Sequence, residues 1–132
     1  MDMESRNNSK KKSIRRLINA FKYSIDGLKY AYKYEQSMTI HITVTTIVVI
    51  GGLYFEVSVI EWLFLFLLIG LIVGVELINT SIEATIDLMS PQTHPLAKIA
   101  KDTASAAVFI LSTVAFVGGC IVFIPKIIER FF

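Results

Sequence analysis

The chain has 132 residues, of which 54% are hydrophobic and 18% are charged, and its formal net charge is +2. A soluble domain of this length interrupts its apolar residues every few positions, whereas this chain concentrates them in three long blocks. The composition therefore excludes an ordinary soluble domain and predicts an all-α membrane protein. The single cysteine, Cys120, excludes an internal disulfide and is interpreted as a small apolar residue.

The first 34 residues predict a basic, flexible N-terminus over 1–12 and an amphipathic helix over 13–34. In the second segment, apolar residues recur three or four positions apart and define one helical face. They are Ile14, Leu17, Ile18, Phe21, Ile25, Leu28 and Tyr32. Cations and other polar residues occupy the opposite face. We expect this helix to lie in the membrane interface with its cations near anionic headgroups.

The three apolar blocks that follow are each close to the ~20 residues that span a bilayer. We expect spans at about 36–55, 61–86 and 101–125, which form a transmembrane domain over 35–132.

The distribution of Lys and Arg predicts the orientation of these spans. Nine of the thirteen cations precede the first span, and the short connection between the first two spans has none. The connection between the second and third spans carries Lys98 and Lys101. Because cations favour cytoplasmic loops, we expect a cytoplasmic N-terminus and a cytoplasmic connection between the last two spans.

A stripe of polar residues ends the second span. Glu76, Asn79, Glu83 and Asp87 are spaced so that all four share one helical face, and no charge precedes them from Trp62 to Val75. An acidic residue deep in a bilayer is unfavourable by roughly 2.5–3.5 kcal/mol. The stripe therefore requires a cation, a partner helix or both, and it indicates a functional site.

Several copies of the chain are expected to associate. Three spans cannot hide all of the polar residues of the first two spans within one protomer. Gly70 and Gly74 form a pair of small residues one turn apart, which would permit close approach of helices.

The available residue types narrow the chemistry without deciding it. No glycine-rich phosphate loop or protein-kinase motif is present, and His41 and His94 lack the partners of a zinc site. Paired glutamates with an asparagine are hard oxygen ligands suited to Mg²⁺, and Lys101 could neutralise a phosphate. Phosphoryl transfer at a membrane surface fits this set. A small oligomeric ion or proton pathway uses the same residue types, and spacing alone leaves both open.

Two motifs carry a resemblance to a known family. The segment ELINTSIEATID, from Glu76 to Asp87, is similar to the pattern E-x-x-N-[ST]-[AS]-I-E-x-x-x-D, and AKDTASAAV at 100–108 is similar to A-K-D-x-[GA]-[SA]-A-A-V. Glu35 stands at the family's expected place before the first span. The chain thus resembles the bacterial membrane diacylglycerol kinase and undecaprenol kinase family from about Arg16 to the third span.

The resemblance implies a homotrimer in the bacterial cell membrane, with active sites shared between protomers, MgATP as donor, a lipid alcohol as acceptor and no nucleic-acid partner. By position, Glu76 would be the general base, Asn79 would orient the acceptor or the base, and Glu35 and Glu83 would hold Mg²⁺ at the nucleotide. The residues implied at ATP are Arg16, Tyr23, Glu35, Glu83, Gln92, Thr93, His94, Lys101 and Asp102.

The branch of the family suggests the acceptor. The segment YEQSMTIH resembles the Gram-positive branch in Glu35, Ile40 and His41, although Ser37 replaces an asparagine. Members of that branch act chiefly on undecaprenol, so undecaprenol is the expected substrate and diacylglycerol the alternative. Ala104 replaces a glycine found in some members, which is expected to have little consequence.

Simpler interpretations exist for single residues. Glu35 could be an ordinary interfacial carboxylate, Lys101 a positive-inside charge, and Arg16 a phospholipid anchor. Tyr23 suits an interfacial helix without any role at ATP, and His41 is interpreted as a hydrogen-bonded intramembrane histidine. None of these interpretations explains the fixed motif around Glu76.

Overall fold

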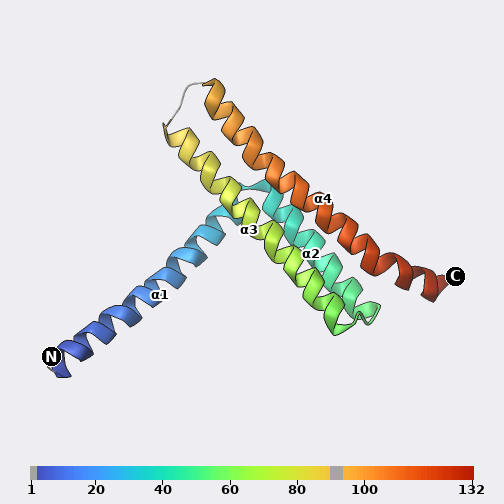
Figure 1. The fold of residues 1–132 in the computed structure, drawn as a ribbon, viewed down its shortest axis with the longest axis horizontal. Coiled ribbons are helices and arrows are strands. Elements are labelled where there is room, and N and C mark those ends of the chain that lie inside the picture. Colours follow the sequence, from blue (N-terminus) through green and yellow to red (C-terminus); the bar gives the residue numbers. More distant parts are fainter. Residues whose placement is uncertain (1–2, 90–93) are drawn as a thin grey trace. The chain divides into compact units, whose positions relative to one another are not determined.

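The computed structural model describes residues 3–89 and 94–132, with side chains from residue 13 onward. Within those residues the chain is helical: α1 is Met3–Tyr34, α2 is Gln36–Tyr54, α3 is Val59–Met89 and α4 is Pro95–Phe131 (Figure 1). The all-α prediction is confirmed. Contacts divide the chain into two units, residues 1–34 and 35–132, at the boundary expected between the N-terminal segment and the transmembrane domain.

The first unit consists of α1, which begins at Met3 and therefore continues ten residues upstream of the expected helix start at 13. Its large apolar side chains are exposed, from Ile14 to Tyr34, whereas the small residue Ala31 is buried. Near its end the Tyr30 and Tyr34 rings lie 4.8 Å apart, and the Lys33 ammonium lies 5.2 Å from the Tyr34 ring.

The second unit holds the three helices that are long and apolar enough to cross a membrane. Their bounds differ from the predicted spans mainly at the polar ends: α3 continues to Met89, and α4 begins at Pro95 and continues to Phe131. These extensions are charged or interfacial in sequence, so hydropathy could not include them. Helix α3 packs along α4 and also contacts α2 (Figure 1).

A tight turn joins α2 to α3. Glu56 adopts a left-handed conformation with φ of 50°, and the Val57 N–H donates to the Gly52 carbonyl at 3.0 Å, which closes the end of α2. Ser58 and Glu61 then form a reciprocal capping box: the Ser58 N–H donates to Glu61 Oε2 at 2.6 Å, and the Glu61 N–H donates to Ser58 Oγ at 3.3 Å. Two orphan donors at the start of α3 are satisfied in this way.

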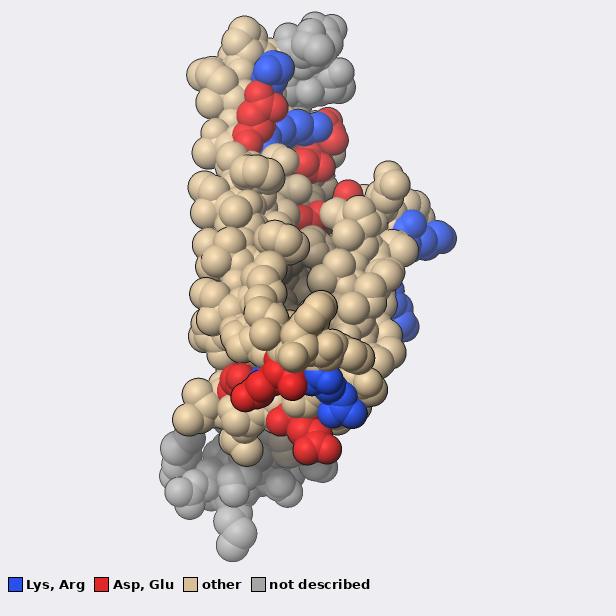
Figure 2. Space-filling model, turned by 90° about the vertical axis from the view of Figure 1, so that its right-hand side faces the viewer, with Lys and Arg blue, Asp and Glu red and all other residues tan. Residues whose placement is uncertain are grey.

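Charged pairs lie at both ends of the bundle. At the end with the α2–α3 turn, Lys126 pairs with Glu61 at 3.1 Å, and the Arg130 guanidinium lies 4.7 Å from the Tyr54 ring. At the other end, Lys101 pairs with Asp87. In Figure 2 acidic side chains gather toward the upper and lower parts of the visible face, and uncharged side chains fill most of the surface between them.

The packed core is small. Val57, Leu65 and Val122 are buried together, and Trp62 and Phe123 pack against them. A cavity of about 480 Å³ adjoins this cluster between α2, α3 and α4, and its lining is apolar apart from a few polar residues that include His41. Only 11% of the most apolar stretch of each span is buried within the chain, so lipid or other protein copies must cover the rest.

Two glycines allow the closest approaches between helices. A Cβ added at Gly52 would lie 2.5 Å from the Trp62 ring, and one added at Gly118 would lie 2.7 Å from the Leu68 side chain. Gly70 and Gly74, the pair expected to permit close packing, have nothing within 4 Å of an added Cβ among the residues that the structure describes.

Replacing Gly52 with Ala should destabilise the bundle by about 1–3 kcal/mol, because the rigid Trp62 ring must move to admit the methyl group. The measurement is the midpoint of thermal unfolding in detergent. Gly27→Ala is the matched control, since an added Cβ there has no described neighbour within 4 Å and alanine favours a helix. Equal midpoints for Gly52→Ala and wild type would contradict this packing.

Candidate active site

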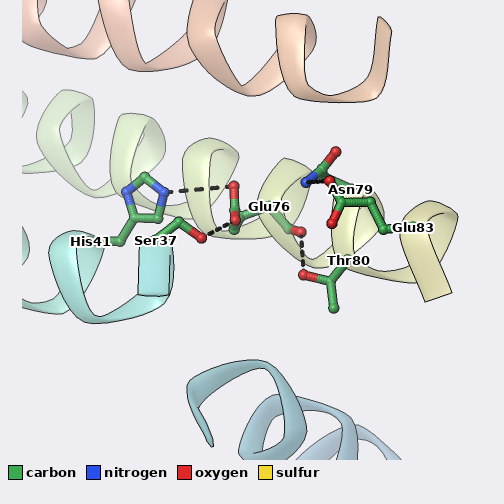
Figure 3. Close-up of polar contacts among 6 residues, drawn as sticks. All are labelled: Ser37, His41, Glu76, Asn79, Thr80 and Glu83. Carbon is green, nitrogen blue, oxygen red and sulfur yellow. Dashed lines mark hydrogen bonds and ion pairs between the residues drawn. The ribbon is translucent and has the colours of Figure 1, made fainter. Parts of the chain in front are cut away.

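Glu76 is the most buried carboxylate among the described residues, with 3% of its surface exposed, and it lies on α3. Two residues of α2 face it (Figure 3). The Ser37 hydroxyl donates a hydrogen bond to Glu76 Oε1, and His41 Nε2 lies 3.8 Å from Glu76 Oε2. On α3 itself, the Thr80 hydroxyl donates to the Glu76 backbone carbonyl at 3.0 Å. The carboxylate is thus held between two spans rather than facing lipid.

Asn79 and Glu83 continue the stripe on α3. Asn79 is 8% exposed, and its Nδ2 donates to Glu83 Oε1 at 3.2 Å (Figure 3). The other amide atom, Asn79 Oδ1, is buried and has no hydrogen-bond partner among the described residues. A buried oxygen without a donor is costly, and it is suited to accept from a ligand or to face a cation.

The charged end of the stripe connects α3 to α4. Lys101 Nζ, on α4, lies 2.5 Å from Asp87 Oδ1 on α3. Asp102, the next residue along α4, pairs with Lys98 at 2.9 Å one turn earlier, and both of those side chains are exposed. The two members of the Lys-Asp motif therefore have different partners, and the Lys101–Asp87 pair connects the beginning of α4 to the end of α3.

The proposed metal ligands supply oxygen atoms without forming a closed cage. Glu35 is half-buried and precedes α2 in an extended conformation, and Glu83 is half-buried on α3. No group of three or more His, Cys, Asp or Glu side chains gathers around one point in the part of the chain that the structure describes. Mg²⁺ usually takes one or two carboxylates and keeps waters or substrate phosphates, and the carboxylate of Glu83, hydrogen-bonded to Asn79, offers the oxygen atoms that this ion prefers.

The residues expected at ATP are distributed over the whole chain. Arg16 and Tyr23 are exposed on α1, which forms a unit of its own. His94 caps α4, where its Nδ1 accepts from the Leu96 N–H at 3.2 Å, and Pro95 occupies the first turn. Gln92 and Thr93 lie outside the described residues.

Sequence reasoning did not anticipate the partners of Glu76. In the sequence, Ser37 stands out only as a departure from an asparagine, whereas its hydroxyl bonds Glu76 in the structure. The sequence predicts a hydrogen-bonded His41, but its Nε2 is buried without a hydrogen-bond partner among the described residues. The available signal was their spacing. Two polar residues four positions apart in an apolar span share one face, and such a face needs a polar partner on another helix.

The candidate site lies within a region that is similar to known proteins. The model of the family "Prokaryotic diacylglycerol kinase" matches residues 22–123. An undecaprenol kinase of Bacillus subtilis is 37% identical over 114 residues, which cover 86% of this chain and 93% of that protein. A diacylglycerol kinase of Helicobacter pylori is 42% identical over 101 residues, covering 76% and 79%. A diacylglycerol kinase of Escherichia coli is 33% identical over 106 residues, covering 80% and 87%.

The family model extends along most of the chain and includes α2, α3, the Lys-Asp motif and most of α4. These matches confirm the resemblance carried by the two motifs. The chain belongs to the prokaryotic diacylglycerol kinase family, and it is a membrane-bound lipid kinase.

Proposed function

We propose that this kinase transfers the γ-phosphate of ATP to the hydroxyl of a membrane lipid alcohol, with undecaprenol as the main acceptor and diacylglycerol as the alternative. The single observation that supports this chemistry best is the Glu76 carboxylate, 3% exposed at the cytoplasmic end of an apolar span as we orient it. The similarity to the undecaprenol kinase of Bacillus subtilis, over 93% of that protein, favours undecaprenol.

In the proposed mechanism Glu76 is the general base. Its carboxylate accepts the proton of the lipid hydroxyl as the oxygen attacks the γ-phosphorus, the bond from that phosphorus to the β-phosphate oxygen breaks, and ADP leaves. Asn79, whose Oδ1 is unpaired in this structure, orients the acceptor or the base. Little covalent chemistry is asked of the protein, so positioning and charge neutralisation supply most of the acceleration.

The nucleotide is assigned to the charged end of the stripe. Glu35 and Glu83 would hold Mg²⁺, which neutralises charge on the phosphates when it is bound. Lys101 would exchange Asp87 for a phosphate, because the side chain is still 35% exposed in its ion pair. Asp102, Arg16, Tyr23 and the connection that contains Gln92, Thr93 and His94 would surround the rest of ATP.

The proposed assembly is a homotrimer in the bacterial cell membrane with its N-terminus in the cytoplasm. Each span exposes most of its apolar surface, which leaves ample surface for lipid and for neighbouring copies. The cytoplasmic orientation rests on the excess of cations before the first span, and it brings the stripe to the side where ATP is available. Helix α1 would lie in the interface.

Glu76→Gln should lower kcat about 10²- to 10⁴-fold, the usual contribution of a general base, with ATP binding nearly unchanged. The measurement is ATP-dependent phosphorylation in detergent–lipid micelles that contain undecaprenol and diacylglycerol in equal amounts. Glu129→Gln, an exposed carboxylate near the end of α4, is the matched control and should behave as wild type.

The products of that assay separate the alternatives. Preferential polyprenyl phosphate supports undecaprenol as the acceptor, and preferential phosphatidate would replace it by diacylglycerol with the same mechanism. Full turnover by Glu76→Gln would remove Glu76 from the role of base. Absence of both products and of ATP binding would favour an ion or proton pathway, which vesicle transport without ATP would then reveal.

Glu83→Gln should raise the Mg²⁺ concentration needed for half-maximal rate by about tenfold or more, because even an outer-sphere partner of a metal site contributes about that factor. A Mg²⁺ titration of the phosphorylation rate at saturating ATP measures it. The control is Asp26→Asn on α1, an acidic residue without an assigned role. An unchanged titration curve for Glu83→Gln would exclude Glu83 as a ligand.

A further inference from the structure

We propose that Ser37 and His41 of α2 are positioning residues that set the orientation of the Glu76 carboxylate. This inference rests on the proposed role of Glu76 as the base. It adds two residues that have no function in the proposed mechanism. Both are turned toward the same carboxylate, one at each oxygen (Figure 3).

The first step is the geometry of α2. Ser37 and His41 are four residues apart, so one turn of helix brings both side chains to the same face. The Ser37 hydroxyl bonds Oε1 across a sequence separation of 39 residues, and His41 Nε2 faces Oε2. Other hydroxyls of the same helix do not act in this way: Thr43 and Thr46 donate to backbone carbonyls one turn earlier in α2.

The second step is the difference between the two carboxylate oxygens. Oε1 accepts a hydrogen bond from Ser37, which fixes the rotation of the carboxylate plane. Oε2 lies 3.8 Å from His41 Nε2, a separation too long for a hydrogen bond. Ser37 therefore occupies one oxygen and leaves the other free to act as the proton acceptor.

The third step concerns His41. Its side chain is 15% exposed, it lines the apolar cavity between the three spans, and its Nε2 is buried without a hydrogen-bond partner among the described residues. A buried polar atom without a hydrogen bond lowers the stability of the fold, so its presence suggests a functional role. The imidazole therefore lies beside Oε2 and also lines the cavity, a position from which it can limit how far the carboxylate turns.

A purely structural role would also link α2 to α3, and the two roles differ in what they predict. A structural link contributes to the stability of the folded protein and has no specific effect on kcat. A positioning role lowers kcat without altering KM for ATP, and it depends on the chemical group at each position. A hydroxyl at 37 and a nitrogen-borne hydrogen at 41 should therefore restore activity even in a different side chain.

The test measures kcat, KM for ATP and the thermal midpoint of the full-length protein with undecaprenol in detergent–lipid micelles. Ser37→Ala should lower kcat about 10- to 100-fold, the usual worth of a hydrogen bond to a charged group, with KM for ATP within about twofold of wild type. Ser37→Thr should recover most of that loss. His41→Leu should lower kcat, and His41→Gln should recover part of it.

Thr43→Ala is the matched control, since it removes a hydroxyl of α2 that bonds only its own helix, and it should leave kcat unchanged. The inference is overturned if Ser37→Ala keeps kcat within about twofold of wild type while Glu76→Gln is inactive, an outcome that leaves the proposed base intact. It is also overturned if Ser37→Thr is no better than Ser37→Ala.

The failure of the proposed function has a different signature. Wild-type protein that phosphorylates no lipid alcohol, or full activity of Glu76→Gln, would overturn the base together with its positioning residues. If Ser37→Ala does not fold, the comparison of His41→Leu with His41→Gln decides: equal kcat values for these two variants overturn the inference, and a higher value for His41→Gln supports it.

Discussion

The constraint on which the second unit depends is the placement of carboxylates in helices that are otherwise apolar. Glu76 is almost fully buried at the end of a long uncharged stretch, and each of its oxygens is faced by a residue of α2. Further along α3, Asn79 donates to Glu83, and Asp87 takes its partner Lys101 from α4. The stripe thus couples α3 to both neighbouring helices. Since a buried carboxylate without polar partners is costly in such surroundings, the contacts of Glu76 restrict how α2 and α3 can slide or rotate against each other.

The apolar part of the bundle determines the arrangement of the helices less specifically than the polar contacts do. Its core is a small cluster around Val57, Leu65 and Val122, and most large side chains of the spans remain exposed within the single chain. Close approach is concentrated at Gly52 and Gly118, where a ring or a leucine side chain occupies the space of a Cβ. In lipid there is little hydrophobic drive between helices, so such contacts and the polar pairs carry the packing. The exposed faces are the surfaces on which neighbouring copies would pack in the proposed trimer.

The candidate site combines a buried carboxylate that is held by a hydrogen bond with charged side chains in exposed ion pairs. Glu76 is held from two helices, which suits a base that must meet a hydroxyl in one orientation. Lys101 and Asp102 lie near the charged end and pair with Asp87 and Lys98. These exposed or half-exposed ion pairs are weak, so phosphates can replace them at little cost. In the proposed mechanism, a base held by a hydrogen bond beside exchangeable charges suits a lipid acceptor that stays in the membrane and a nucleotide that comes and goes.

The sequence by itself determined the helical class, the three spans and the residues of the stripe on α3, because hydropathy and helical periodicity are local properties of the chain. The fixed spacing of two motifs also determined the family. The sequence did not predict the ends of α3 and α4, because polar helical turns outside the apolar stretch carry no hydropathy signal. Only the tertiary structure decided that Ser37 and His41 face Glu76 and that Lys101 joins Asp87. Such pairings depend on the rotation of one helix against another, which packing fixes at positions such as Gly52 and Trp62 and which no single helix encodes.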